Sequence, residues 1–385
     1  MSRIKVCQVI NSYHVGGAET VALNLARGLD PERYESLVVA VAEPRTDGAP
    51  EMLRRFQDAG VPAYRLYHQR YGSLAALWDM FRFFRRHRPD IVHGHNRPTD
   101  AWAYKIGKLA GVPHRMWTRH LVYDQMRPRL LRRYRSLGRE VPVVAAVSDA
   151  VREHSIGFEH MEADRIRVIV NGIDTERFRP LTDDERLAKR QELGLAPHEL
   201  MLLQVGRLAE QKAPQAFLSL IDELRSRDPR VWGFLCGTGP LAGELEPRAD
   251  EAGVTMLGLR NDVPELLGAA DLVVSCSRVE GLPLNIMEAM AAGAPFVGPG
   301  LDQIRQLIST DERLSRGLYT PPPTTGEVPA ERIAEWAEVT AGILADADWL
   351  ETCRGRGPEI IGTLYSLRSM IEAYEQVYRE LATGR

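Results

Sequence analysis

Residues 271–293 read DLVVSCSRVEGLPLNIMEAMAAG. A short apolar run ends near Ser275, a loop with glycine and proline follows, and a helical pattern begins near Leu284. Backbone amides at the start of a helix point outward, and the helix dipole favours negative charge there. The segment therefore predicts a strand, loop and helix that can seat a diphosphate, with Glu280 before the helix and Glu288 about one turn inside it.

Short apolar runs alternate with amphipathic stretches along the rest of the chain. In the first half they predict strands over Ile4–Ile10, Ser36–Ala42, Ile91–His95, His114–Thr118 and Val143–Val147. Turn-forming residues interrupt the pattern at 171–184, and strands resume over Leu202–Val205, Val231–Cys236, Val254–Leu257, Leu272–Ser275 and Pro295–Val297. Helical segments such as Ala18–Leu29 and Leu74–Arg86 lie between the strands. This order predicts an α/β protein with two Rossmann-like, doubly wound parallel sheets, whose ligands bind at the carboxyl ends of the strands.

The length and composition of the chain agree with two globular domains. A chain of 385 residues exceeds what one hydrophobic core usually supports. The four cysteines are scattered without paired spacing, which is typical of reduced thiols in a cytoplasmic protein. No apolar run approaches the roughly 18 residues of a membrane span, and the N-terminus enters a strand directly. We therefore expect neither a membrane helix nor a secretion signal.

The charge is unevenly distributed along the chain. Residues 1–168 carry a net +9, with 27 Lys and Arg against 18 Asp and Glu, whereas the remaining residues carry −12, with 22 against 34. Two basic amphipathic segments, 82–88 and 127–135, lie in the first part. Such segments can dock on anionic lipid, although a solvated helix face explains them equally well. We expect a cytoplasmic protein, with the inner face of the membrane as one possible location and with no nucleic acid partner.

The segment 271–293 resembles the signature of the retaining nucleotide-sugar glycosyltransferases of family 4 (glycosyl transferases group 1), which have the GT-B fold. Further blocks match that family in the same order, namely Gly16-Gly17-Ala18-Glu19, Val168-Ile-Val-Asn171-Gly172, Val205-Gly206-Arg207 with Lys212, and Gly237-Thr-Gly-Pro240. The resemblance implies an acceptor-binding domain over 1–170, completed by a C-terminal helix at about 366–385 that crosses back to it. A nucleotide-sugar donor domain over 171–365 would face the first domain across a cleft.

The resemblance also implies roles for particular side chains. Arg207 and Lys212 resemble the family's basic clamp and would neutralise the diphosphate and the charge that develops on the leaving group. Of Glu280 and Glu288, one would hold ribose hydroxyls and the other the transferred sugar. His120 would hydrogen-bond a hydroxyl of the donor sugar. The implied catalytic residues are Glu280, His120, Arg207 and Lys212, and the implied donor-binding residues are Gly16, Gly17, Arg207, Lys212, Gly237, Arg260, Glu280, Gly281, Leu282, Pro283, Leu284 and Glu288.

Two further histidines, His93 and His95, stand at the end of a predicted strand, followed by Asn96. These three residues are candidates for acceptor binding. A metal site is an alternative for the histidines, but we expect their side chains to face opposite sides of the strand, which favours a structural or supporting role.

The sequence gives little reason to expect a metal ion. Asp346-Ala347-Asp348 spells the D-x-D motif of metal-dependent glycosyltransferases, yet it lies in the helical C-terminal part, far in sequence from every phosphate motif. A helix cap is the more ordinary role for such a motif. Because Arg207, Lys212 and a helix start can neutralise the phosphates, we expect activity without a metal or any other cofactor.

One block departs from the family pattern. Residues 300–306 read GLDQIRQ, where the family usually has two glycines followed two residues later by a Pro-Glu pair. Any contact to the donor through that loop is therefore in doubt.

The function that we expect is retaining transfer of a hexose-type sugar from a nucleotide diphosphate sugar, with UDP first and GDP next, to a glycan, lipid-linked or small-molecule acceptor. Cell-surface polysaccharide, glycolipid or secondary-metabolite synthesis would use such a step. The alternatives are a nucleotide-sugar epimerase or a phosphorylase-like enzyme on the same scaffold, and a catalytically idle sugar-binding protein. A phosphorylase would need a cofactor lysine in the tail, but Lys212 is the last lysine of the chain.

Overall fold

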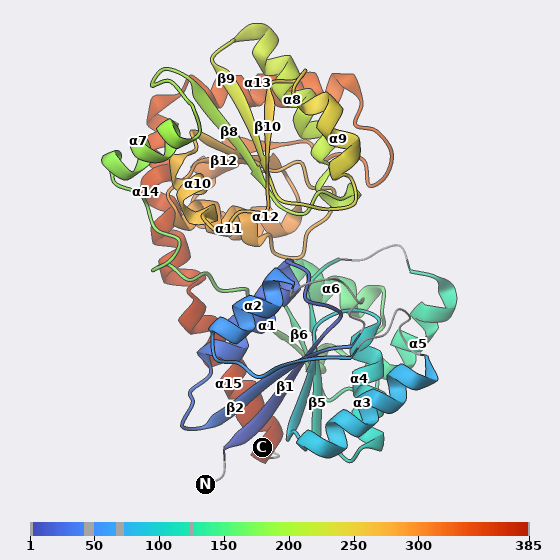
Figure 1. Ribbon diagram of the computed structural model, residues 1–385. Coiled ribbons are helices and arrows are strands. Elements are labelled where there is room, and N and C mark those ends of the chain that lie inside the picture. The colour runs from blue at the N-terminus through green and yellow to red at the C-terminus, as the bar shows by residue number, and fades with distance from the viewer. Residues whose placement is uncertain (1–2, 42–49, 67–72, 123–125, 384–385) are drawn as a thin grey trace. The chain divides into compact units, whose positions relative to one another are not determined.

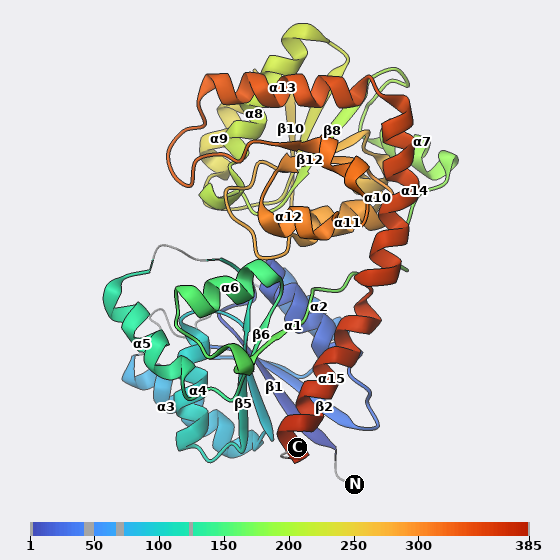
Figure 2. The same cartoon turned by 180° about the vertical axis from the view of Figure 1, so that it is seen from behind.

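The computed structural model describes residues 3–41, 50–66, 73–122 and 126–383. The chain forms two compact units, one made of Met1–Gly172 with Leu367–Arg385 and the other of Ile173–Ser366. Each unit is a parallel sheet with helices on both faces (Figures 1 and 2). The predicted pair of Rossmann-like, doubly wound sheets is therefore confirmed.

The sheet of the first unit has the strand order β3-β2-β1-β4-β5-β6-β7, and all its pairs are parallel. The strands are β1 (Ile4–Ile10), β2 (Tyr34–Ala40), β3 (Ala63–Arg65), β4 (Ile91–Gly94), β5 (His114–Arg119), β6 (Val143–Ala146) and β7 (Ile166–Val168). The order reverses between β1 and β4. The loops after these two strands therefore leave the sheet in different directions, which is where such folds bind ligands.

A layer of helices covers each face of this sheet, and side chains of β1 are therefore buried on both faces. Cys7 and Val9 lie in a core with α3 and α4, whereas Ile10 lies in a core with α1 and α2. The helices of the unit are α1 (Gly17–Gly28), α2 (Glu51–Asp58), α3 (Leu74–His87), α4 (Thr99–Leu109), α5 (Pro128–Gly138), α6 (Asp149–Gly157) and α15 (Leu367–Thr383).

The C-terminal helix α15 belongs to the first unit, as predicted, and lies against α1 (Figure 1). Its buried face has helical spacing and consists of Met370, Tyr374, Glu375, Val377 and Tyr378. The Glu375 carboxylate accepts a hydrogen bond from the amide of Asp30 at 2.9 Å, and its carbonyl accepts one from the Tyr34 hydroxyl at 3.1 Å. The last helix is thus anchored by polar bonds as well as by apolar packing.

The second unit repeats the architecture, with the strand order β10-β9-β8-β11-β12-β13 and a reversal between β8 and β11. Its strands are β8 (Leu200–Val205), β9 (Val231–Cys236), β10 (Val254–Gly258), β11 (Leu272–Val274), β12 (Phe296–Pro299) and β13 (Leu318–Tyr319). Its helices are α7 (Asp183–Glu192), α8 (Pro214–Arg227), α9 (Ala242–Ala249), α10 (Val263–Ala269), α11 (Leu284–Ala291), α12 (Asp302–Leu307), α13 (Ala330–Leu344) and α14 (Ala347–Leu364).

The predicted strands are all present, with ends displaced by one or two residues in most cases. Three edge or near-edge strands were not predicted, because β3, β7 and β13 span only two or three residues and show no usable alternation. No helix in the described ranges is long and apolar enough to cross a membrane.

Candidate active site

The loops that follow β8 and β11 carry the residues of the predicted diphosphate clamp. Arg207 follows β8 and is exposed, Lys212 ends a short 3-10 turn in the same loop, and Glu280 lies in the loop after β11. Lys212 Nζ lies 2.5 Å from Glu280 Oε1, and the Glu280 side chain is only 6% exposed. The fold thus brings Lys212 and Glu280, which are 68 residues apart in sequence, into an ion pair where the strand order reverses.

Hydrogen bonds join these two loops beside the ion pair. Gln211 Nε2 donates to the carbonyl of Val279 at 3.0 Å, and the Arg278 amide donates to the carbonyl of Gln211 at 2.8 Å. The buried Arg278 guanidinium donates to three more backbone carbonyls, those of Glu210, Pro323 and Gly326. Gln211 and Val279, which directly precede Lys212 and Glu280, therefore tie the two loops together, and this limits the movement of the pair.

The segment that departs from the family pattern contributes to the same frame. Gln303 on α12 is buried, and its Nε2 donates to the backbone carbonyl of Glu280. Asp302 is exposed and Gln306 is half-buried. Sequence reasoning recognised the departure but missed this contact, because no local pattern links Gln303 to a loop 23 residues earlier.

The predicted diphosphate seat is the start of α11. The helix begins at Leu284, and residues 281–283 before it are buried. Asn285 Nδ2 donates to the last carbonyl of β8 at 3.1 Å, while its buried Oδ1 accepts no hydrogen bond from the residues that the structure describes. Glu288 lies one turn further on and is half-buried. The amide of Asn285 thus fixes the helix start against the strand that leads to the clamp.

Gly237 lies where the loop after β9 meets the loop after β8. Its φ is +144°, and a Cβ atom there would lie 1.9 Å from the carbonyl oxygen of Gly206. Only glycine allows the two loops to approach so closely. The loop after β9 therefore packs directly on the loop that leads to Arg207.

Arg260, predicted to bind the donor, is engaged by acidic side chains. Its guanidinium lies 2.6 Å from Asp262 and 2.9 Å from Glu192, and Lys189 lies 2.9 Å from Asp262. Hydrogen bonds to Asp262 and Glu192 raise the pKa of Arg260, and the hydrogen bond from Arg260 lowers that of Asp262. In this arrangement the side chain braces the loop between β10 and α10 against α7.

The glycine loop of the first unit leads into α1. Gly16 is the N-cap with extended backbone, and the helix begins at Gly17, one residue earlier than predicted. A Cβ atom on Gly16 would lie 2.6 Å from the Glu19 carboxylate, which belongs to the first turn. The small residue leaves room for this carboxylate at the helix start.

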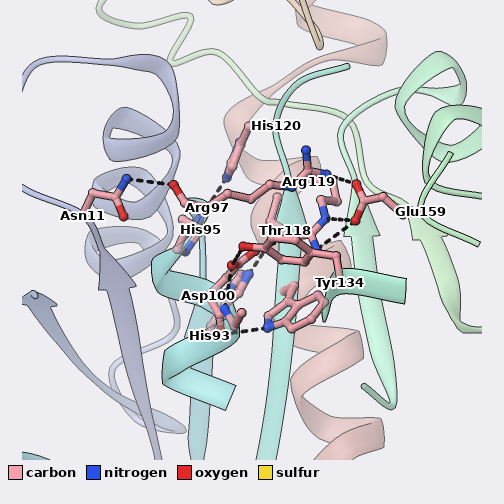
Figure 3. Close-up of polar contacts among 12 residues, drawn as sticks. Asn11, His93, His95, Arg97, Asp100, Thr118, Arg119, His120, Tyr134 and Glu159 are labelled. Carbon is pink, nitrogen blue, oxygen red and sulfur yellow. Dashed lines mark hydrogen bonds and ion pairs between the residues drawn. The ribbon is translucent and has the colours of Figure 1, made fainter. Parts of the chain in front are cut away.

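His93 and His95 face the same side of the sheet, so the expectation of opposite faces is wrong (Figure 3). Side chains alternate along a strand, and residues two apart therefore share a face. Their ring centroids are 4.1 Å apart. His93 is fully buried, and its two ring nitrogens bond Tyr378 and Thr118 at 2.7 Å each. Neither nitrogen is therefore left to bind an acceptor substrate.

His120 lies next to this pair, at the end of β5. Its Nε2 lies 3.1 Å from His95 Nδ1, and His95 Nε2 lies 2.7 Å from Gln8 Oε1. Among the described residues, His120 Nδ1 has no hydrogen-bond partner. The ring of His120 is half-buried and stacks on His95, with Nε2 turned toward His95 and Nδ1 left to meet a ligand (Figure 3).

Asn96 joins the loops at the reversal of strand order in the first sheet. Its Oδ1 accepts a hydrogen bond from the Asn11 amide at 3.1 Å, and Asn11 Nδ2 donates to the carbonyl of Arg97 at 3.2 Å. Asn96 is half-buried. It therefore fastens the loop after β4 to the end of β1.

A buried ion cluster, which we define as Asp100, Arg119, Glu159 and Arg97, lies beside the histidines (Figure 3). Arg119 bonds Asp100 and also reaches Glu159 at 3.1 Å, and Arg97 bonds the other oxygen of Glu159. The side chains of Asp100 and Glu159 are fully buried. Sequence reasoning missed the cluster, because its members come from three separate segments of the chain.

The D-x-D motif has the predicted structural role. Asp346 caps α14, with its Oδ1 accepting a hydrogen bond from the Trp349 amide at 2.9 Å. Within the described ranges, no three His, Cys, Asp or Glu side chains are grouped so that they could hold a metal ion.

The histidine pKa values predict a pH-dependent stability of the first unit. Burial, and then the charge of His120, lowers the pKa of His93 to about 3, and burial, and then Arg119, lowers that of His120 to about 3. Burial lowers the pKa of His95 well below its usual range. Below about pH 6.5 the unfolded chain therefore binds protons that the folded chain does not. The free energy of unfolding should decrease as the pH is lowered from about 6.5 to about 3.

We expect His93 alone to contribute a slope of about 1.4 kcal/mol per pH unit in this window. Hydrogen exchange of amides in β4 and β5 between pH 7.5 and pH 5.5 measures the opening free energy. His93→Gln should make the decline with pH shallower, whereas His198→Gln, at an exposed position, should leave it unchanged. An equal slope in wild type and His93→Gln would contradict the prediction.

Two Rossmann-like units with a final helix that returns to the first are the architecture of GT-B glycosyltransferases. The model of Glycosyltransferase Family 4 matches residues 15–177, and that of Glycosyl transferases group 1 matches residues 185–340. The chain belongs to this family of glycosyltransferases.

Curated relatives and solved structures agree with this assignment. EpsF of Bacillus subtilis (strain 168), whose name describes it as a glycosyltransferase, is 28% identical over 88% of each chain. An Escherichia coli UDP-Gal:alpha-D-GlcNAc-diphosphoundecaprenol alpha-1,3-galactosyltransferase is 27% identical over 77% of this chain and 79% of its own. The fold matches that of Anabaena Alr3699/HepE in complex with UDP and glucose, with a TM-score of 0.82 and 21% identity over 98% of this chain and 100% of the other.

Proposed function

We propose that the chain transfers a hexose from a nucleoside diphosphate, UDP before GDP, with retention of the anomeric configuration and without a metal ion. The observation that supports this most is the Lys212–Glu280 pair, held beside the start of α11. A cation and a helix N-terminus in one place favour a diphosphate and stabilise the charge that it gains as a leaving group.

Each candidate residue has a physical role in this proposal. Arg207 and Lys212 neutralise the phosphates, and they and the helix start supply the charge that a divalent cation would otherwise provide. Glu280 and Glu288 hold hydroxyls of the sugar and the ribose. His120 accepts a hydrogen bond from a sugar hydroxyl. No carboxylate acts as a nucleophile in this scheme, so the acceptor attacks from the face that the diphosphate leaves.

The names of the relatives support the choice of substrates. The Escherichia coli enzyme uses a UDP-sugar and a diphosphoundecaprenol-linked acceptor, and HepE was solved with UDP and glucose. We therefore propose a UDP-hexose donor and a glycan or lipid-linked acceptor from cell-surface polysaccharide synthesis.

A panel of nucleotide sugars tests this function. UDP-hexoses should raise the unfolding temperature and be slowly hydrolysed, and the released sugar should keep its anomeric configuration when observed by NMR at early times. Excess chelator should leave the rate unchanged. Loss of activity in chelator, inversion of the anomeric centre, or no response to any nucleotide sugar would each contradict a part of the proposal.

We also propose that α3 docks on an anionic membrane surface. Leu74 and Trp78, one turn apart, are 88% and 59% exposed, and Arg82, Arg85 and Arg86 are exposed on the same helix. Exposed apolar side chains beside arginines are typical of helices that lie in the lipid headgroup layer. The segment 127–135 fits less well, because Tyr134 and Leu137 of α5 are buried and Arg133 stacks on Trp102.

Vesicles of phosphatidylcholine with added phosphatidylglycerol should pellet the protein, whereas pure phosphatidylcholine should not. Arg82→Gln, Arg85→Gln and Arg86→Gln together should weaken binding about 100-fold, since each basic residue contributes about 1 kcal/mol. Arg227→Gln with Arg230→Gln, on exposed parts of the second unit, should leave binding unchanged. Equal binding by both sets of variants would contradict a role for α3.

A further inference from the structure

A continuous chain of hydrogen bonds runs through the first unit from His120 to the C-terminal helix. We call it the relay, and its members in order are His120, His95, Gln8, Tyr378, His93, Thr118 and Tyr374. The links are between 2.7 and 3.2 Å long. Gln8, His93 and Tyr378 are fully buried. The proposed sugar contact is therefore connected to α15 without an intervening gap.

The amide of Gln8 gives the first part of the relay a direction. Its Oε1 can only accept, so the proton of His95 must be on Nε2. Because the His95 ring is neutral, its Nδ1 is an acceptor, and His120 Nε2 must donate to it. The neutral His120 ring then carries no proton on Nδ1, the nitrogen that has no partner among the described residues.

The bond from Gln8 to Tyr378 has the donor and acceptor that this orientation of the amide requires. Gln8 Nε2 donates to the Tyr378 oxygen at 3.2 Å, and the Tyr378 hydroxyl is then free to donate to His93 Nδ1 at 2.7 Å. His93 Nε2 consequently donates to Thr118. If the Gln8 amide turned over, every link up to His120 would reverse, and the proton of His120 would move to Nδ1.

We propose that Tyr378 and Gln8 are positioning residues that hold His120 in the tautomer whose Nδ1 accepts a hydrogen bond from a sugar hydroxyl. The inference rests on the role proposed above for His120. It gives the returning helix α15 a function beyond packing, because this helix supplies the hydroxyl at the centre of the relay.

A double-mutant cycle tests the proposal. Tyr378→Phe keeps the aromatic ring but removes the hydroxyl, and it should lower kcat about ten- to hundredfold with little change in the donor KM. Gln8→Met should have a similar effect and serves as a second variant if the first folds poorly. Tyr34→Phe is the matched control, since its hydroxyl also bonds α15, at the Glu375 carbonyl, but lies outside the relay.

Each substitution is repeated in a His120→Ala background. If Tyr378 acts through His120, Tyr378→Phe should have almost no further effect there, whereas a merely structural defect would lower kcat by the same factor in both backgrounds. Full activity of His120→Ala alone would overturn the proposed role of His120. Loss of activity in His120→Ala without any loss in Tyr378→Phe would overturn the relay.

Nitrogen NMR of histidine-labelled protein gives a readout that does not depend on activity. The wild type should show His120 with its proton on Nε2, and Tyr378→Phe should shift this signal toward a mixture of tautomers. His120→Ala assigns the signal. A proton on Nδ1 of His120 in the wild type, or an unchanged tautomer in Tyr378→Phe, would overturn the proposal.

Discussion

Lys212→Met should lower the rate of sugar transfer about 10²- to 10³-fold, the range found when one preorganised donor to a developing negative charge is removed. The ammonium of Lys212 lies 2.5 Å from Glu280 Oε1 and beside the start of α11, where we place the leaving diphosphate. Its charge is most valuable in the transition state, as the diphosphate takes up negative charge. The loss should therefore appear in kcat more than in the KM of the donor.

Steady-state kinetics with the preferred UDP-sugar measures this effect. Arg227→Met removes a cation from an ion pair with Glu223 on the outer surface of the same unit, and it should leave kcat unchanged. Lys212→Arg should recover little activity, since a planar guanidinium does not occupy the position of a compact ammonium. A decrease in kcat of less than threefold in Lys212→Met would remove Lys212 from the proposed mechanism.

Arg119→Met should destabilise the first unit by about 3–5 kcal/mol, the usual cost of removing one partner from a buried ion pair. The Arg119 side chain is 2% exposed and bonds both Asp100 and Glu159, which are fully buried. Without the guanidinium, the Asp100 carboxylate keeps hydrogen bonds only from the Tyr134 hydroxyl at 2.6 Å and the Ala101 amide at 2.6 Å among the described residues. A carboxylate in that position lacks compensating charge.

Chemical denaturation, monitored by hydrogen exchange of the β5 amides, measures this loss of stability. Adding Asp100→Asn to Arg119→Met removes the uncompensated charge and should recover part of the stability. Arg152→Met, which breaks a surface pair with Glu153, should cost less than 1 kcal/mol or so. If Arg119→Met lost no more stability than Arg152→Met, the buried ion cluster would contribute no more than a surface ion pair, and the prediction would be wrong.

Local sequence patterns were sufficient for most of the fold. The alternation of apolar runs and amphipathic helices predicted two parallel sheets, since β strands such as β1 and β8 are buried on both faces and read as continuous apolar runs. The helix α11 begins at Leu284, and the sequence predicted a helix that begins near this residue, because proline and glycine end the preceding segment. Short edge strands such as β13 were missed, because two residues are too few to show the alternation of apolar and polar side chains that marks a strand.

The sequence proposed the members of the candidate site but not the contacts between them. Arg207, Lys212 and Glu280 were selected through their position after strands and their resemblance to a family motif. The bond from Gln303 to the Glu280 carbonyl was not predictable, because it joins two loops that meet only in the folded unit. Arg260 likewise required the structure to reveal its two acidic partners.

The sequence by itself determined the class of fold, the order of the strands and helices, and the helix start that can seat a diphosphate, because each depends on neighbouring residues. Tertiary structure alone decided which distant polar groups meet. The ion pair of Lys212 with Glu280, the buried cluster around Arg119 and the relay from His120 to Tyr378 join residues from separate strands and helices. Hydrogen bonds and ion pairs act over about 3 Å, so only the packed sheet could bring these groups within reach of one another.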